Sequence, residues 1–196
     1  MELNVTALKS HHVGPVSFTL KSGETLIISG ASGSGKSILL RALADLDPHS
    51  GELVLNGQSC EDILPEMWRK QVGLLPAESQ WWRDTVGEHF PAEYQFSQFG
   101  FEQVVATWSI SRLSTGEKQR LAILRLLVNK PKVLLLDEPT ASLDQDNTRS
   151  VEQHIADYQS ASGAMVIWVS HDEQQMARIN GRHCAMEDGR LQGCEA

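Results

Sequence analysis

Residues 25–37 have the sequence TLIISGASGSGKS, and this stretch decides the fold. Thr25–Ser29 is a continuous apolar run of strand length, as expected for a strand that is buried on both faces. Residues 30–37, GASGSGKS, fit the pattern G-x-x-x-x-G-K-[ST]. Residues 37–46 then have helical character and end before Asp47-Pro48. A strand, a glycine-rich loop and a helix therefore follow one another directly, which predicts a loop that wraps around phosphate.

The residue types of this loop suit phosphate chemistry. Glycines let the backbone curl without Cβ clashes, so that several N–H groups converge on one anion, and the helix start adds its positive dipole end. Lys36 is expected to place its ammonium between the β- and γ-phosphates, and Ser37 to offer its hydroxyl to Mg²⁺. The expected nucleotide-binding residues are Gly30, Ala31, Ser32, Gly33, Ser34, Gly35, Lys36, Ser37 and Ile38.

A second apolar strand, Val133–Leu136, ends in two carboxylates. Successive strand side chains point to opposite faces, so Asp137 and Glu138 are expected to point to different places. Asp137 is predicted to hold Mg²⁺ through its water shell. Glu138 is predicted to face the γ-phosphate, where a carboxylate within reach of a water acts as general base or orients that water.

The remaining chain alternates predicted strands with predicted helices. Strands are expected at residues 16–20, at 52–55 as half of a hairpin, at 164–169, and in a terminal hairpin over 184–192. Helices are expected from about residue 121 to 129 and from 147 to 159, with short helices in a small aromatic-rich subdomain over 81–108. This order predicts an α/β fold with a mainly parallel sheet.

Composition narrows the classes of function. The chain has 196 residues and a formal net charge of −8, which argues against a nucleic-acid partner because phosphate contacts need a basic face. The sequence contains no apolar stretch long enough to span a membrane and no secretory signal, so a membrane role would need another chain. Cys60, Cys184 and Cys194 form no C-x-x-C pair and are expected to be three reduced thiols.

Three further motifs resemble the ABC ATPase family. Residues 113–120, LSTGEKQR, resemble its LSGGQ signature; residues 131–144, PKVLLLDEPTASLD, resemble its acidic strand and following loop; residues 169–172, VSHD, resemble its histidine switch. The resemblance covers nearly the whole chain. It implies a single ABC ATP-binding domain over residues 1–196: a P-loop NTPase core, an N-terminal antiparallel β-subdomain, and a short helical subdomain at about residues 78–128.

The resemblance also implies a mechanism with ATP and Mg²⁺. Two copies face head to tail, and each ATP lies between the phosphate loop of one copy and the signature of the other. The signature residues are Ser114, Thr115, Gly116 and Glu117. They precede a helix, so their N–H groups form a second anion-binding helix start. Asp144 is placed in the loop between copies, and His171 on the γ-phosphate, where it joins Glu138 and Lys36 as a catalytic residue.

The chain departs from the family pattern in the signature, in the phosphate loop and at the expected glutamine near Mg²⁺. Thr115 replaces the first glycine of the signature and adds a Cβ where backbone approaches phosphate, and Glu117 replaces a glutamine. In the phosphate loop, Ile38 replaces a usual threonine. Ala77 stands where the family has a glutamine near Mg²⁺, with Glu78 or Gln80 as substitutes.

The base-binding end departs as well. No Tyr, Phe or Trp occurs between Met1 and Phe18 to stack on adenine. His11 or His12 offers a flat ring for this purpose; alternatively both are solvated loop residues.

Three functions are open at this stage. The first is a transporter motor at the inner face of the cell membrane, bound to an integral membrane permease; Trp81 and Trp82 either anchor that partner or pack within the small subdomain. The segments KQRLAILR and VIWVSHD resemble stand-alone bacterial subunits of an iron- or metal-export type. The second is a soluble ATPase of an assembly complex of the iron–sulfur kind. The third is a weakly active nucleotide-binding regulator, motivated by Ala77 and Thr115.

Overall fold

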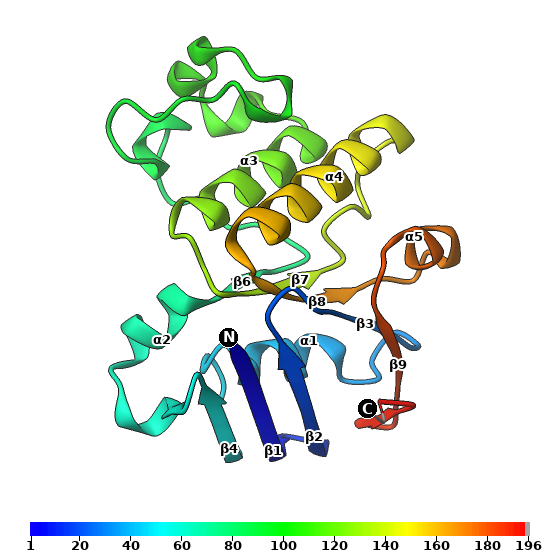
Figure 1. Ribbon diagram of the computed structural model, residues 1–196. Helices are drawn as coiled ribbons and strands as arrows, with labels where there is room; N and C mark the ends of the chain where they lie inside the picture. Colours follow the sequence, from blue (N-terminus) through cyan, green and yellow to red (C-terminus); the bar gives the residue numbers. More distant parts are fainter. Residues whose placement is uncertain (195–196) are drawn as a thin grey trace.

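The structure is a computed structural model that describes residues 1–194, and its centre is a six-stranded sheet in the order β10-β9-β3-β8-β7-β6 (Figure 1). Strands β9, β3, β8, β7 and β6 run parallel, and β10 is antiparallel to β9. The bounds are β3 Thr25–Ser29, β6 Val72–Leu75, β7 Val133–Asp137, β8 Met165–Val169, β9 Arg182–Glu187 and β10 Arg190–Gln192. The predicted α/β class with a mainly parallel sheet is confirmed.

Helices are present where they were expected over residues 37–46, 121–129 and 147–159, the second beginning earlier, at Thr115, and two further helices were not predicted. The helices are α1 Lys36–Leu43, α2 Pro65–Gln71, α3 Thr115–Val128, α4 Gln145–Ser162 and α5 Glu173–Arg178. Figure 1 shows α3 and α4 together on one face of the sheet and α1 on the other. Because α1, α4 and α5 follow the parallel strands β3, β7 and β8, the loops that leave the carboxyl ends of these strands meet at one edge of the sheet.

The strands separate two apolar cores by their alternation. In β7, Val133 and Leu135 pack into the core that contains α1 and the N-terminal strands, whereas Leu134 and Leu136 pack into the core under α3 and α4. All four side chains are fully buried. This continuous apolar sequence is what a two-faced buried strand requires, because neither face meets water.

A second sheet is formed by the N-terminal part of the chain. It is antiparallel, in the order β2-β1-β4-β5, with β1 Glu2–Ser10, β2 Val13–Lys21, β4 Ser50–Leu55 and β5 Gln58–Ser59. Alternate residues of β2, such as Val16, Phe18 and Leu20, are buried against α1 and the large sheet. The expected antiparallel β-subdomain is therefore present, and the hairpin of β4 and β5 turns at Asn56 and Gly57 as predicted.

The segment between β6 and α3 differs from the expected short helices. Residues 76–114, all of them described, contain only 3₁₀ turns of three to five residues, and no α-helix. The turns are Gly87–His89, Gln98–Gly100, Gln103–Thr107 and Ile110–Arg112. Phe96, Phe99 and Val105 are buried beneath them against α3 and α4. This segment is stabilised by apolar burial and not by an extended helical ladder, and Pro91 and Gly100 disfavour a continuous helix through it.

The cysteine prediction was wrong. Cys184 of β9 and Cys194 form a disulfide, with their Cα atoms 5.2 Å apart, and Cys60 is a buried free thiol. The β9–β10 hairpin folds the chain back and brings the two cysteines together, an arrangement that a ten-residue separation does not reveal in sequence. Across residues 1–194, no helix has both the length and the apolar character needed to span a bilayer.

Candidate nucleotide site

The loop between β3 and α1 has the geometry of a phosphate cradle. Gly30, Gly33 and Gly35 all have φ between 79° and 142°, a backbone region that residues with a side chain rarely adopt. A Cβ at Gly30 would lie 2.3 Å from the Met186 carbonyl oxygen, so only glycine fits there. Helix α1 begins at Gly35 with no side-chain cap and no acidic residue in its first turn, which leaves its positive end available to an anion.

Lys36 lies folded over this loop. Its ammonium donates to the carbonyl oxygens of Gly30 at 2.8 Å and of Ala31 at 2.9 Å, and the residue is buried. Burial lowers the pKa of Lys36, and the carboxylates of Glu138 and Asp137 oppose that shift. The predicted lysine, strand-end aspartate and strand-end glutamate are thus brought within electrostatic reach of one another.

Asp137 and Ser37 form the expected oxygen pair beside the loop. Asp137 is buried, and burial raises the pKa of its carboxyl group, while a hydrogen bond from the Ser37 side chain works in the opposite direction. A carboxylate and a hydroxyl are oxygen donors of the kind that Mg²⁺ prefers. The donor set therefore fits a magnesium ion at this position.

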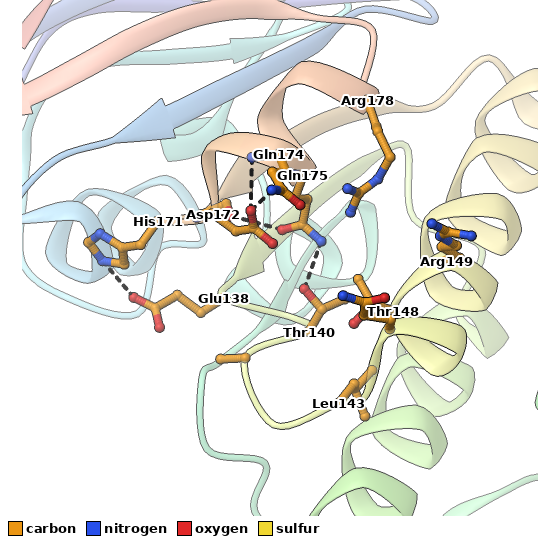
Figure 2. Close-up of a pocket in the computed structure, with 13 residues that line it drawn as sticks. Glu138, Thr140, Leu143, Thr148, Arg149, His171, Asp172, Gln174, Gln175 and Arg178 are labelled. Atoms are coloured by element: carbon orange, nitrogen blue, oxygen red, sulfur yellow. Dashed lines mark hydrogen bonds and ion pairs between the residues drawn. The ribbon is translucent and has the colours of Figure 1, made fainter.

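Glu138 and His171 meet at the edge of the sheet. His171 Nε2 lies 2.9 Å from Glu138 Oε1, and both side chains are partly open to solvent (Figure 2). Glu138 has φ of 47°, a strained conformation for a residue with a side chain, and its N–H donates to the Val169 carbonyl at 3.2 Å. The backbone of β8 thus holds Glu138 turned away from the strand direction, as a residue facing a ligand requires.

Lys36, Ser37, Glu138 and His171 lie around one hollow of about 240 Å³. It is lined by His12, Ser32, Gly33, Gly35, Lys36, Ser37, Ile38, Glu138 and His171. Of the two candidate stacking residues, only His12 lines it. Ala77, Glu78 and Gln80 do not line it, and all three are exposed.

Gln175 is a buried residue of the site that sequence reasoning missed. It accepts a hydrogen bond from the Ser170 hydroxyl at 2.8 Å. Its Nε2 donates to Thr140 Oγ1 at 2.8 Å (Figure 2). Ser170 precedes His171, and Thr140 lies two residues after Glu138, so Gln175 ties together the two loops that carry these side chains. No motif marks it; only its place on α5, directly after the histidine, could have suggested it.

The predicted signature residues cap α3. Ser114 Oγ accepts from the Glu117 N–H at 3.2 Å, and the Glu117 carboxylate accepts from the Ser114 N–H at 2.9 Å, which is a capping box. Hydrogen bonds from Ser114 lower the pKa of Glu117, so the helix start carries an anion of its own. A Cβ at Gly116 would lie 3.2 Å from Leu143 Cδ2, which places the signature beside the loop that leads to Asp144.

Asp144 has a local role that the sequence analysis did not foresee. It is the N-cap of α4: its Oδ1 accepts from the Asn147 N–H at 2.8 Å, and its Oδ2 accepts from Asn147 Nδ2 at 2.8 Å. These bonds lower the pKa of Asp144. Neither Asp144 nor any signature residue lines the hollow around Lys36 within this chain.

The fold and the hollow define a phosphate-loop nucleotide-binding protein. Comparison with known proteins gives its relatives. A family model described as "ABC transporter" matches residues 13–141. The chain is 36% identical, over an alignment of 176 residues that covers 82% of it and 78% of the relative, to the "Probable iron export ATP-binding protein FetA" of Escherichia coli (strain K12).

Two solved structures share the fold. A dimeric post-hydrolysis state of the ATP-binding cassette MJ0796, bound to ADP and Pi, is 24% identical with a TM-score of 0.75, and the match covers 100% of both chains. A bacterial Atm1-family ABC exporter with ATP bound is 22% identical with a TM-score of 0.83; the match covers 97% of this chain and 38% of that one. The present chain belongs to the ABC transporter family, as an ATP-binding subunit with the ATPase fold.

Proposed function

We propose that this chain is the motor subunit of an ABC transporter, and that it hydrolyses ATP between two copies of itself at the inner face of the cell membrane. The observation that carries the proposal is the convergence of Lys36, Ser37, Glu138 and His171 on one hollow beside a curled phosphate loop, with Asp137 hydrogen-bonded to Ser37. These are the groups that phosphoryl transfer to water needs: an anion cradle, a cation on the phosphates, and a base.

Each side chain then has a distinct task. Phosphate oxygens accept hydrogen bonds from the N–H groups of the loop and of the α1 start. Lys36 gives up its hydrogen bonds to the Gly30 and Ala31 carbonyls and binds the β- and γ-phosphates instead. Glu138 accepts a proton from the attacking water or orients it. His171, already 2.9 Å from Glu138, bonds the γ-phosphate and keeps that water in line.

Ser37 and Asp137 would hold Mg²⁺, Ser37 directly and Asp137 through water. The ion, when bound, neutralises charge on the β- and γ-phosphates. The neighbouring Lys36 ammonium opposes the repulsion between Asp137 and the phosphate oxygens.

The second half of the site comes from a partner copy. Two anion-binding helix starts exist in the chain, at α1 and at α3, and only the first lies at the hollow. A head-to-tail dimer places the start of α3, with Ser114, Thr115, Gly116 and Glu117, on the γ-phosphate of the other copy, and brings the Asp144 loop to the same interface. ATP closes this dimer, and hydrolysis opens it.

The movement is delivered to an integral membrane permease. Trp82 is exposed while Trp81 is half-buried, and Arg125 stacks over both rings. Trp82 thus suits an interface anchor, and Trp81 packs within its own chain. The similarity to FetA makes iron the first cargo to test.

The alternative function, a soluble ATPase of an assembly complex, predicts that the chain copurifies with soluble proteins. Copurification with a membrane protein from solubilised membranes would favour the transporter.

The proposal is tested with Glu138→Gln and Lys36→Ala. Glu138→Gln keeps the hydrogen-bonding shape but not the base, so we expect ATP binding and ATP-dependent dimers with hydrolysis reduced by about 10²- to 10⁴-fold. Lys36→Ala should lose most ATP affinity and form no dimers. Sedimentation and a phosphate-release assay measure both, with exposed Glu187→Gln as control. Full turnover in Glu138→Gln, or unchanged ATP binding in Lys36→Ala, contradicts these roles.

A further inference from the structure

A cluster of three different ligand types lies at the far end of α1 from the phosphate loop. Asp45 follows the last turn of α1, His49 precedes β4, and Cys60 begins the 3₁₀ turn Cys60–Asp62 after β5. Their carboxylate, imidazole and thiol ligand atoms all lie within 4.8 Å of one another. Two segments, the connection between α1 and β4 and the turn after β5, are thus brought to one point by the fold.

The distances suit ligands around a metal ion better than they suit a hydrogen bond. His49 Nε2 and Asp45 Oδ1 are 3.5 Å apart, beyond the usual range for a hydrogen bond between nitrogen and oxygen. Two ligands about 2.1 Å from a tetrahedral ion are roughly 3.4 Å apart. The three ligand atoms, all within 4.8 Å of one another, are thus near the spacing that a tetrahedral ion needs, and such an ion has a fourth position for water.

His49 supplies an independent observation. Its side chain is only 10% exposed, and its Nδ1 is buried without a hydrogen-bond partner. A buried polar atom left unpaired costs about 1–3 kcal/mol. Within residues 1–194 the imidazole therefore has one ring nitrogen, Nδ1, without a partner, while the other, Nε2, faces Asp45 Oδ1 at 3.5 Å.

The surrounding charges leave the ligands available. Arg69 donates through Nε and Nη2 to the Asp45 backbone carbonyl at 3.2 and 2.9 Å, and it lies 3.5 Å from Asp45 Oδ2, so Oδ1 is left to face His49. Cys60 is buried, and burial together with Asp45 and Glu61 raises its pKa to about 11, so a bound ion has to displace the thiol proton. The same environment opposes a role as a free reactive thiol, which needs a lowered pKa.

We propose that Asp45, His49 and Cys60 form a binding site for a divalent transition-metal ion of the zinc class. Thiolate and imidazole select such ions over Mg²⁺, which prefers oxygen ligands alone. The bound ion joins the end of α1 to the start of β4 and to the turn after β5, so it stabilises the contact between the phosphate-loop helix and the N-terminal sheet. Zn²⁺ should raise the melting temperature of the chain by mass action.

The test uses the full chain in excess Mg²⁺, which fills oxygen-only sites, with Co²⁺ as a spectroscopic probe and Zn²⁺ as competitor. We expect a thiolate-to-cobalt charge-transfer band that Zn²⁺ abolishes. Cys60→Ser should lose the band, and His49→Gln and Asp45→Asn should weaken binding by at least ~10-fold. Asn also tolerates the left-handed backbone of Asp45, where φ is 54°, so that variant should fold.

Two controls separate this site from the other cysteines and histidines. The Cys184→Ser/Cys194→Ser double variant should keep the band, and His183→Gln, on the exposed face of β9, should bind with unchanged affinity. Circular dichroism and ATP binding show that each variant is folded. A chain that gives no charge-transfer band, or a band that survives in folded Cys60→Ser, overturns the proposal, and so does equal binding by His49→Gln and His183→Gln.

Discussion

His12 and His171 are the two flat rings that line the hollow beside the phosphate loop, and His171 is already paired with Glu138, which leaves His12 for the adenine base. A Cβ at Gly35 would lie 3.6 Å from His12 Nε2, so the imidazole stands next to the start of α1. His11, its neighbour, has φ of 51° and does not line the hollow. The sequence left His11 and His12 open as stacking partners, and the geometry favours His12.

His12→Asn should therefore weaken ATP binding by roughly 2- to 10-fold, since ring stacking contributes about 0.5–1.5 kcal/mol. His11→Asn is the matched control, because asparagine tolerates its left-handed backbone. Affinity is measured by titration with ATP and with tripolyphosphate, which has no base. Equal losses for both nucleotide and tripolyphosphate would mean that His12 acts on the phosphates and not on adenine.

The helix starts divide into two chemical kinds. Helices α3, α4 and α5 are each capped by a side chain, from Ser114, Asp144 and Asp172. Helix α1 has no such cap and begins at Gly35. The uncapped glycine start of α1 keeps its N–H groups for an external anion, whereas at α3 the Ser114 hydroxyl occupies the Glu117 N–H and leaves the earlier N–H groups of that turn for the partner's γ-phosphate. Helix α2 has no side-chain cap either, but Pro65 lacks an N–H and Glu66 is acidic in its first turn, so α1 is the start suited to phosphate within one chain.

Substitutions of Asp144 test whether its hydrogen bond to the Asn147 N–H stabilises the start of α4. Asp144→Ala removes the acceptor for the Asn147 N–H and should lower the free energy of unfolding by about 1 kcal/mol. Asp144→Asn keeps an oxygen acceptor and should leave stability nearly unchanged. Urea unfolding measures both. If Asp144→Asn is as unstable as Asp144→Ala, the charge and not the cap stabilises this helix.

Gln175 on α5 tests the link between the two loops. Gln175→Ala leaves the buried hydroxyls of Thr140 and Ser170 without their partner, so we expect a loss of about 1–3 kcal/mol in stability. It should also lower kcat more than it raises KM, because Glu138 and His171 are then less well held. Gln174→Ala, an exposed neighbour, is the control. A stability loss with unchanged kcat would limit Gln175 to a structural role.

Local chemistry explains which elements were predictable. Apolar runs, glycines and charges that are adjacent in sequence predicted the strands β3, β7 and β8, the phosphate loop and the Asp137-Glu138 pair. Gln175 and the disulfide of Cys184 and Cys194 depend on loops and hairpins meeting in space, which no short pattern encodes. Short helices were expected over residues 81–108, where the structure has 3₁₀ turns, because burial of aromatic rings, and not backbone propensity, decides the shape of this segment.

The charge of the whole molecule bears on how two copies meet. Each copy carries a formal net charge of −8, and the proposed interface adds two ATP molecules. Glu117 and Asp144, both with lowered pKa values, lie at or next to the α3 start that would face the partner's γ-phosphate. Closure of the dimer must therefore overcome repulsion between like charges at both sites.

Glu117→Gln should strengthen the ATP-bound dimer. Glutamine also completes a capping box with Ser114, so α3 keeps its start, while one negative charge per site is removed. Unit charges about 6 Å apart in water repel by about 0.7 kcal/mol, and two symmetric sites give roughly a tenfold lower dissociation constant. Sedimentation in the hydrolysis-deficient Glu138→Gln background measures the dimer dissociation constant at low salt, where screening of the charges is weak. Glu52→Gln, which removes the same charge from the exposed edge of β4, should leave the constant unchanged; an equal gain there would assign the effect to net charge and not to the signature.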